Sequence, residues 1–178
     1  MHRFALSAVA LCALLSASAC CSSTNGCSPS DAAIDGQKSS ATTVLPVTRI
    51  RAEPHPLTYN SGIEEPARVV ATSASQWAQL WSAIWRKYSA PPALPQIDFA
   101  SEMVVVAAMG TRNSGGYAIY VDSAYQHSDR IEVVIRTMSP GSRCGTTAAL
   151  TEPVDVARIP ASSLPVRFRE RGTVHECP

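Results

Sequence analysis

The feature that most restricts the fold is a stretch from about Ser75 to Tyr88 in which large apolar residues recur at three- and four-residue steps. This is the period of one helical face. The recurring residues are Trp77, Leu80, Trp81, Ile84, Trp85 and Tyr88. Ser73 or Ser75 can cap the amino end of this helix, and Pro91-Pro92 prevents its continuation. Because an aromatic face at regular helical spacing is usually buried, we expect it to pack on a sheet.

The other apolar residues lie in short segments of strand length. These segments are 44–51, 67–72, 103–109, 117–122, 130–138, 154–159 and 166–169. Segment 103–109 is apolar almost throughout, which is typical of a central strand covered on both faces. Segments 117–122 and 130–138 alternate in polarity, and a turn near His127-Ser128-Asp129 predicts a hairpin between them. The pattern therefore predicts an α+β fold, a mostly antiparallel β-sheet with one main amphipathic helix packed on a face.

The amino-terminal residues 1–19 have the form of a secretory signal. Arg3 precedes an apolar run over 4–15, which is shorter than the roughly 20 residues that cross a bilayer. Small residues at 16–19 then lead to Cys20, and Ala17-Ser18-Ala19-Cys20 resembles the lipobox of bacterial lipoproteins. We therefore expect lipidation of Cys20, and the alternative is ordinary secretion after Ala19.

Residues 20–43 are predicted to be the lipidated cysteine and a flexible tether, because they are mainly Ser, Thr, Gly, Ala, Asp and Asn. Acyl chains such as palmitate on Cys20 would anchor the chain, since each buried CH₂ contributes about 0.8 kcal/mol. Cys21 follows, and not the Asp that is usual in lipoproteins retained at an inner membrane. The expected location is the cell envelope, lipid-anchored at an outer membrane and facing the periplasm or the cell surface. Residues 44–178 form the expected single domain.

The mature cysteines form an even set once Cys20 is lipidated. Cys144 and Cys177 lie in the folded part, whereas Cys21 and Cys27 lie in the tether, so we expect a disulfide between Cys144 and Cys177. Such a bond closes a loop of about 30 residues and stabilises by roughly 3–4 kcal/mol. The alternative is two free thiols. No C-x-x-C pair occurs and the histidines are scattered, so neither a metal nor another cofactor is expected.

Charge excludes one class of partner. The chain has a net charge of +1 and 16% charged residues. No strong field is present to attract nucleic acid, and nucleic-acid binding is not expected.

Several residues and short motifs follow one another in a recognisable order between 67 and 168. They are Trp77, Trp81, Leu94-Pro95, Asp98-Phe99, Gly110, Arg112, Gly115-Gly116-Tyr117, Pro140-Gly141, Cys144, Pro153 and Ile159-Pro160. This order resembles the PrcB C-terminal domain family. The resemblance implies a small exported domain, often a lipoprotein, of a family named after a non-catalytic subunit of a surface protease complex. It thus implies a membrane-anchored accessory or modulator of an exported protease. Many relatives have a Pro-Thr-like pair where this chain has Asn113-Ser114.

The predicted binding loop comprises Arg112, Asn113, Ser114, Gly115, Gly116 and Tyr117. Exposed loops on rigid sheets commonly carry binding residues, and Arg112 and Tyr117 are the main contact candidates. The alternative is that the glycines form a hairpin turn, because Gly adopts positive φ without steric cost. Tyr117 can equally belong to the core.

The sequence contains no nucleophile elbow, zinc-protease helix motif, dinucleotide-binding loop or P-loop. The chain is therefore predicted not to be an enzyme. Three hypotheses follow. The first is a protein-binding domain that serves an exported protease. The second is a small-ligand or cell-wall glycan binder that stacks sugars on exposed tryptophans. The third is a thiol hydrolase or redox protein that uses Cys144 with His127 or His175.

Overall fold

The computed structural model describes residues 42–52 and 59–178. The predicted signal, Cys20 and the tether up to residue 41 lie outside the described residues, as do Cys21 and Cys27. Within the described ranges, no helix has the length and apolar character needed to cross a membrane.

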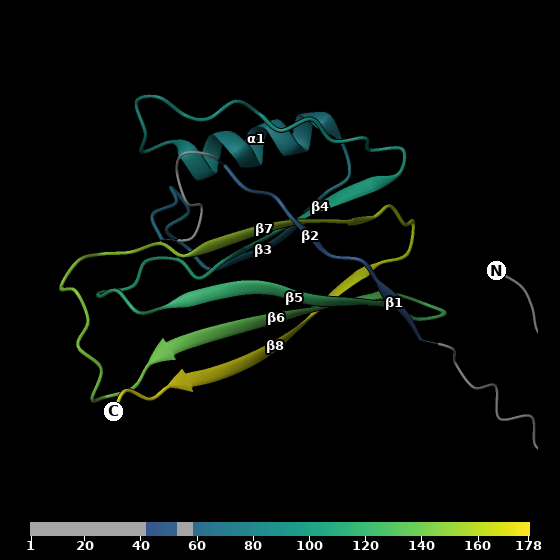
Figure 1. Cartoon of the computed structure of the whole chain (residues 1–178). Coiled ribbons are helices and arrows are strands. Elements are labelled where there is room, and N and C mark those ends of the chain that lie inside the picture. Colours follow the sequence, from purple (N-terminus) through teal and green to yellow (C-terminus); the bar gives the residue numbers. More distant parts are fainter. Residues whose placement is uncertain (1–41, 53–58) are drawn as a thin grey trace, which may run out of the picture. The chain divides into compact units, whose positions relative to one another are not determined.

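The described residues form two four-stranded sheets with one helix, α1 (Figure 1). The first sheet has the order β1-β5-β6-β8, with bounds Thr43–Leu45, Ala118–Gln126, Ile131–Pro140 and Val166–His175. The second sheet has the order β2-β7-β4-β3, with bounds Thr48–Arg49, Val154–Pro160, Glu102–Ala108 and Ala67–Ala71. Every strand pair is antiparallel except β6 and β8, which run parallel. The predicted α+β class, mostly antiparallel with one helix on a face, is confirmed.

The central strand β4 is covered on both faces, as its apolar run predicts. Its alternate residues Val104, Val106 and Ala108 belong to a core shared with the helix. The residues between them, Met103, Val105 and Ala107, belong to a second core shared with the other sheet. The period-two alternation of a strand thus divides β4 between the two cores.

The helix α1 (Ala74–Trp85) buries its aromatic face. Trp77, Trp81 and Trp85 are all buried against the second sheet, which confirms the predicted core packing. The indole nitrogens of Trp77 and Trp81 donate to the carbonyl oxygens of Pro95 and Pro92, each at 3.0 Å. The Ser73 side chain accepts from the backbone N–H of Gln76 and caps the amino end, as expected. The helix ends at Trp85, three residues before the predicted limit.

Three sequence predictions about connections were wrong. One expected sheet is divided into two. The predicted strand 44–51 is two short strands that join different sheets, because Pro46, which has no backbone N–H to donate, lies where the chain crosses between them. The glycine-rich segment before Tyr117 is not a hairpin turn, because β4 and β5 belong to different sheets. The hairpin between β5 and β6 is confirmed, and the His127 N–H donates to the Arg130 carbonyl at 2.9 Å.

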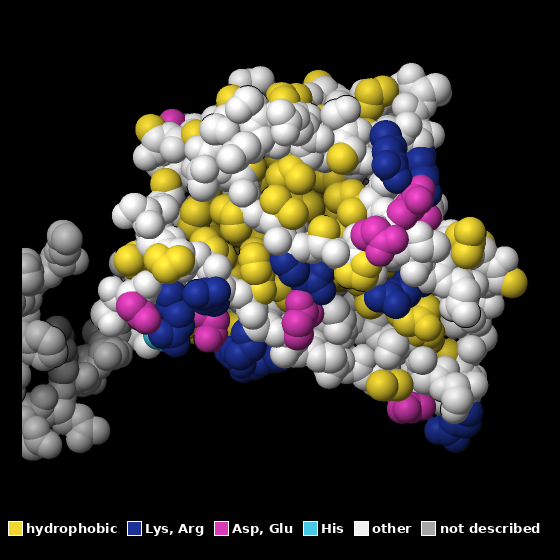
Figure 2. Space-filling view, turned by 180° about the vertical axis from the view of Figure 1, so that it is seen from behind, with side chains coloured by type: hydrophobic (Ala, Val, Ile, Leu, Met, Phe, Trp, Pro, Cys, Tyr) yellow, Lys and Arg dark blue, Asp and Glu magenta, His cyan; other side chains and the backbone are white. Residues whose placement is uncertain are grey.

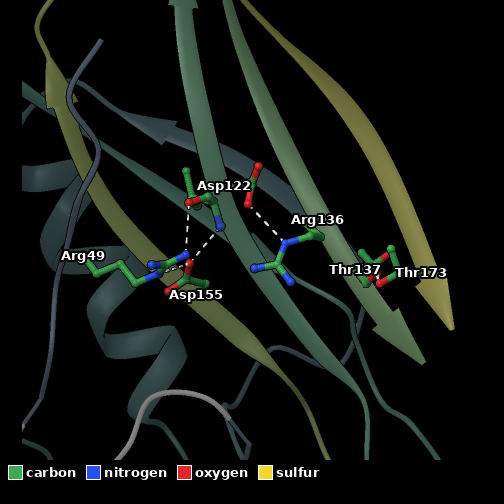
Figure 3. A network of polar contacts seen from close by, with 7 residues as sticks. Arg49, Asp122, Arg136, Thr137, Asp155 and Thr173 are labelled. Carbon is green, nitrogen blue, oxygen red and sulfur yellow. Dashed lines mark hydrogen bonds and ion pairs between the residues drawn. The ribbon is translucent and has the colours of Figure 1, made fainter. Parts of the chain in front are cut away.

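The crossing from β1 to β2 is held by a buried carboxylate (Figure 3). Asp155 of β7 accepts from the backbone N–H of Val121 in β5 at 2.8 Å and from Arg49 Nε in β2 at 3.1 Å. Its hydrogen bond to Val121 meets β5 where the strand has an irregular register between Val121 and Ser123. Asp155 therefore links the two sheets on one side of the stack.

The edge strands β3 and β8 are linked by a second ion pair. Arg68 Nε of β3 lies 2.6 Å from Glu170 Oε1 of β8. Arg68 Nη1 also donates to the carbonyl oxygens of Ala67 and Ala108. This side of the stack is joined by side chains and not by a crossing strand.

Candidate interaction surface

The predicted binding loop connects β4 to β5 and is held in place at both ends. Gly110 has a φ of 70°, in the left-handed region that favours glycine. A Cβ atom there would lie 2.7 Å from the Glu64 carbonyl oxygen. The next residue, Thr111, donates its N–H to that same oxygen at 2.8 Å. Gly110 is therefore required by the close approach of the backbone at residue 64.

Arg112 and Tyr117 contact each other across the loop. The Arg112 guanidinium carbon lies 5.7 Å from the centre of the Tyr117 ring, and its Nη2 donates to the Met109 carbonyl at 2.8 Å. Tyr117 also packs against the core between the sheets. Arg112 exchanges two backbone hydrogen bonds with Thr151, of 2.7 and 3.0 Å. These two residues therefore fix the shape of the loop, and their side chains are only half exposed.

The middle of the loop packs beneath the connection between β6 and β7. The Ser114 carbonyl accepts from Thr151 Oγ1 at 2.9 Å, and the Gly115 N–H donates to the Thr147 carbonyl at 3.0 Å. A Cβ atom at Gly115 would lie 2.5 Å from Thr147 Oγ1. Gly116 has a φ of 86°. The residues of the loop with exposed side chains or backbone are Thr111, Asn113 and Gly116.

The connection over 142–150 is exposed at every position except Cys144, which is half-buried. Leu150 is 67% exposed, which makes it one of the most exposed large apolar side chains among the described residues. Residues 111–117 and 142–150 together form one continuous surface, which we call the loop surface. Sequence reasoning identified its first half only, since nothing in the sequence of 142–150 signals that it lies against the first loop.

Cys144 and Cys177 are brought together at the border of this surface. Their sulfur atoms lie at disulfide distance, 1.99 Å apart, and their Cα atoms are 5.0 Å apart. The Gly141 N–H donates to the His175 carbonyl at 2.8 Å beside them. The end of β8 is thereby tied to the start of the 142–150 connection.

Ion pairs hold the other end of that connection. The buried Glu152 carboxylate accepts from Lys87 Nζ at 2.9 Å. This hydrogen bond raises the pKa of Lys87 above its ordinary value. The Glu152 N–H donates to the Tyr59 carbonyl at 2.8 Å. The 142–150 connection therefore begins at a disulfide and ends at a buried acid.

Asp155 is a buried acid. The residue is 6% exposed, and desolvation raises the pKa of its carboxyl group. The Val121 N–H and Arg49 act in the opposite direction, and desolvation outweighs them. Asp155 lies between the sheets and not in a cleft, so its role is structural. An isolated acid within the apolar strand Val154–Pro160 is the sequence signal for this structural role, and the sequence analysis did not identify it.

Two of the three sequence hypotheses meet contrary geometry. A glycan-stacking surface requires exposed tryptophans, and all three tryptophans are buried. A thiol enzyme requires a free Cys144, which here is bonded to Cys177. His127 precedes β6, whereas Cys144 follows the other end of that strand. Within the part of the chain that the structure describes, no three His, Cys, Asp or Glu residues converge to hold a metal.

A shallow groove lies between β3 and α1. Its volume is about 230 Å³, and it is lined by Val69, Val70, Gln76, Gln79 and Leu80. Figure 2 shows hydrophobic side chains gathered in the middle of one face, bordered by Lys, Arg, Asp and Glu side chains. The groove lining carries no titratable group, so it offers no acid–base chemistry.

The geometry defines a class of protein, a small α+β domain with two sheets. Its buried polar groups form hydrogen bonds that fix the loops, and its exposed loops are supported by the sheets. Residues 103–160 match the family model described as PrcB C-terminal. The match covers β4 to β7, with the predicted loop and Cys144, and leaves out α1 and β8. Comparisons with curated proteins and with solved structures found no match.

Proposed function

We propose that this protein is a non-catalytic binding domain of the cell envelope that serves as an accessory or modulator subunit of an exported protease. The single observation that carries the proposal is the family match over 103–160, because it includes the whole of the predicted loop and the whole of the 142–150 connection. Members of the family are non-catalytic accessory domains. The loop surface is the proposed site of contact.

The packing of the loop surface supports a role in binding. Arg112, Tyr117 and the two glycines hold the loop in one conformation, so little conformational entropy would be lost when a partner docks. Leu150 is an exposed apolar side chain on that rigid support, the kind of residue that anchors an interface when a partner covers it. Asn113 lies on the same surface and supplies an exposed amide.

The lipid anchor belongs to the same proposal. A lipidated Cys20 would hold the domain at a membrane while the tether gives it reach. The protease would then be bound near the membrane that carries the anchor. The proposed location is the outer membrane of the cell envelope, facing the periplasm or the cell surface.

Site-specific photo-crosslinking in the cells that make the protein tests the proposal. A photoreactive amino acid is placed at Asn113 in one strain and at Leu150 in another. The matched control is Ser75, which is exposed on α1, away from the loop surface. The expected result is a crosslink to one exported protease from both loop positions and none from Ser75.

The outcome can contradict the proposal in two ways. If neither loop position yields a specific protein while the protein is present and folded in the envelope, the protein-binding function is wrong. If Ser75 captures the same protein as Asn113, the loop surface is not the site of contact.

A further inference from the structure

The strand β8 is a long, exposed edge. It runs over Val166–His175 and pairs with β6 in parallel at ten successive positions. No other strand pairs with it among the residues that the structure describes. All its residues from Glu170 to His175 are exposed. An edge of this kind presents backbone N–H and C=O groups that can pair with another extended chain.

Three arginines alternate along this edge and share one face. Val166 and Phe168 pack against the core between the sheets, and Glu170 binds Arg68 of the other sheet. Because successive side chains of a strand point to opposite faces, Arg167, Arg169 and Arg171 lie on the outer face of the first sheet. Their spacing is about 7 Å from one to the next.

The outer face carries more positive than negative charge. Arg136 of β6 is the neighbour of Arg171 in register and is paired with Asp122 at 3.1 Å. Arg169 is paired with Glu132 at 2.8 Å. Arg167 and Arg171 have no acidic partner within ion-pair distance in the described part of the chain. The outer face of the first sheet thus carries four arginines and two acidic residues, which leaves an excess of positive charge.

We propose that the edge of β8 binds an extended acidic segment of the partner protein as an added strand, with carboxylates at alternate positions beside Arg167, Arg169 and Arg171. This inference rests on the proposed function and names the chemistry that the partner presents. Opposite charges directly across a strand pair stabilise it, and the unpaired backbone of β8 supplies the hydrogen bonds.

The same arginines disfavour a second copy of this chain as the occupant. Antiparallel pairing of β8 with itself about Arg169 would place Arg167 opposite Arg171 and Arg169 opposite Arg169. A parallel pair in register would place each arginine beside its own copy. Like charges directly opposite one another are destabilising, which is a usual way in which edge strands avoid self-association.

The edge is supported by contacts within the chain. β6 supports β8 along its length, and Thr173 Oγ1 donates to the Thr137 carbonyl at 3.2 Å (Figure 3). Beyond β8, Cys177 is joined to Cys144. The end of β8 therefore lies beside the loop surface, and a strand added to β8 would continue towards it.

The test uses the purified full-length protein and synthetic peptides. The first peptide alternates Glu with Val or Thr over ten residues, the second has the same composition in a scrambled order, and the third carries Lys in place of Glu. Fluorescence anisotropy measures the dissociation constants at low and moderate salt, and NMR locates the backbone amides that shift. We expect the alternating acidic peptide alone to bind, with shifts along β8.

Charge reversal supplies the matched comparison. The double variant Arg167→Glu with Arg171→Glu should weaken binding of the acidic peptide by about tenfold or more, because like charges then face each other. It should gain binding of the Lys peptide. The control Arg51→Glu with Arg86→Glu changes the net charge equally at exposed sites outside both β8 and the loop surface, and it should bind as the wild type does. Circular dichroism and thermal melting check that both variants are folded.

Several results would overturn the inference. These are equal binding of the alternating and scrambled peptides, equal losses in the two double variants, no binding of any peptide, or self-association of the wild type through β8. Failure of this inference can be distinguished from failure of the proposed function. If Asn113 and Leu150 still crosslink to the protease in the β8 variant, the accessory role is retained and only the inferred binding of an acidic strand to β8 is wrong.

Discussion

Truncation of Trp81 to alanine is the most direct perturbation of the packing on which the loop surface depends. The Trp81 side chain is 5% exposed. Its ring centre lies 5.1 Å from that of Trp77 and 5.6 Å from that of Trp85, so it contacts both neighbouring tryptophans in tilted arrangements. Its indole nitrogen also donates to the Pro92 carbonyl.

The expected loss of stability follows from these contacts. Removing a buried aromatic side chain and leaving a cavity costs about 3–5 kcal/mol. A domain of this size has a total unfolding free energy of about 5–15 kcal/mol, so the variant would be at or near the limit of folding. Trp81→Phe keeps much of the ring packing but loses the indole N–H, and it should cost less, with about 0.5–1.5 kcal/mol from the hydrogen bond alone.

Urea unfolding of the full-length protein, followed by far-ultraviolet circular dichroism, measures these differences. The control is Gln79→Ala, an exposed position of the same helix, which should change the unfolding free energy by less than about 0.5 kcal/mol. If Trp81→Ala unfolds within about 1 kcal/mol of the wild type, the helix does not contribute to the core as described.

Three further predictions concern the anchor, a buried acid and a glycine. Cys20→Ser should abolish incorporation of labelled palmitate and release the protein from the membrane fraction; retention in that fraction would contradict the anchor. Because burial raises the pKa of Asp155 above its ordinary value of 3.8, the folded protein binds this proton more tightly than the unfolded chain. The difference in unfolding free energy, wild type minus Asp155→Asn, should therefore be more positive at about pH 3.5 than at about pH 7. An equal difference at both pH values would refute the pKa shift. Gly110→Ala should destabilise by about 1–3 kcal/mol because it forces a side chain into positive φ against the residue 64 carbonyl, whereas Gly145→Ala, with open space around it, should be neutral in the same urea titration.

Local patterns predicted most elements of this fold. The three- and four-residue spacing of the tryptophans located the helix, and Ser73 was among the expected caps. Alternation and apolar runs located β3, β4, β6 and β7 to within a few residues. These signals are local because each depends on which face of a single element is buried.

Pairing between distant segments was not predictable in the same way. An alternating strand has the same sequence pattern whichever sheet it joins. The division into two sheets therefore could not be predicted from the sequences of β4 and β5. The strand β8 extends to His175 although its alternation of apolar residues ends at Phe168, because backbone pairing with β6 carries it further. The parallel direction of that pair is likewise set by the long return of the chain through β7.

The candidate site shows the same boundary between local and distant information. The glycines and the exposed polar residues of 111–117 marked a loop from their sequence alone. The role of Arg112 and Tyr117 in holding that loop depends on their contact with each other and on Thr151, which is far along the chain. Cys144 and Cys177 were expected together because both lie in the folded part, and the structure places them so.

The most direct test of the central claim is a titration of the purified protein with the protease that crosslinks to Asn113. Calorimetry measures the affinity and stoichiometry, with Leu150→Asp as the loop variant and Ser75→Asp as the control. The account predicts saturable one-to-one binding that Leu150→Asp weakens by about tenfold or more and that Ser75→Asp leaves unchanged. Absence of saturable binding, or equal binding by both variants, would contradict it.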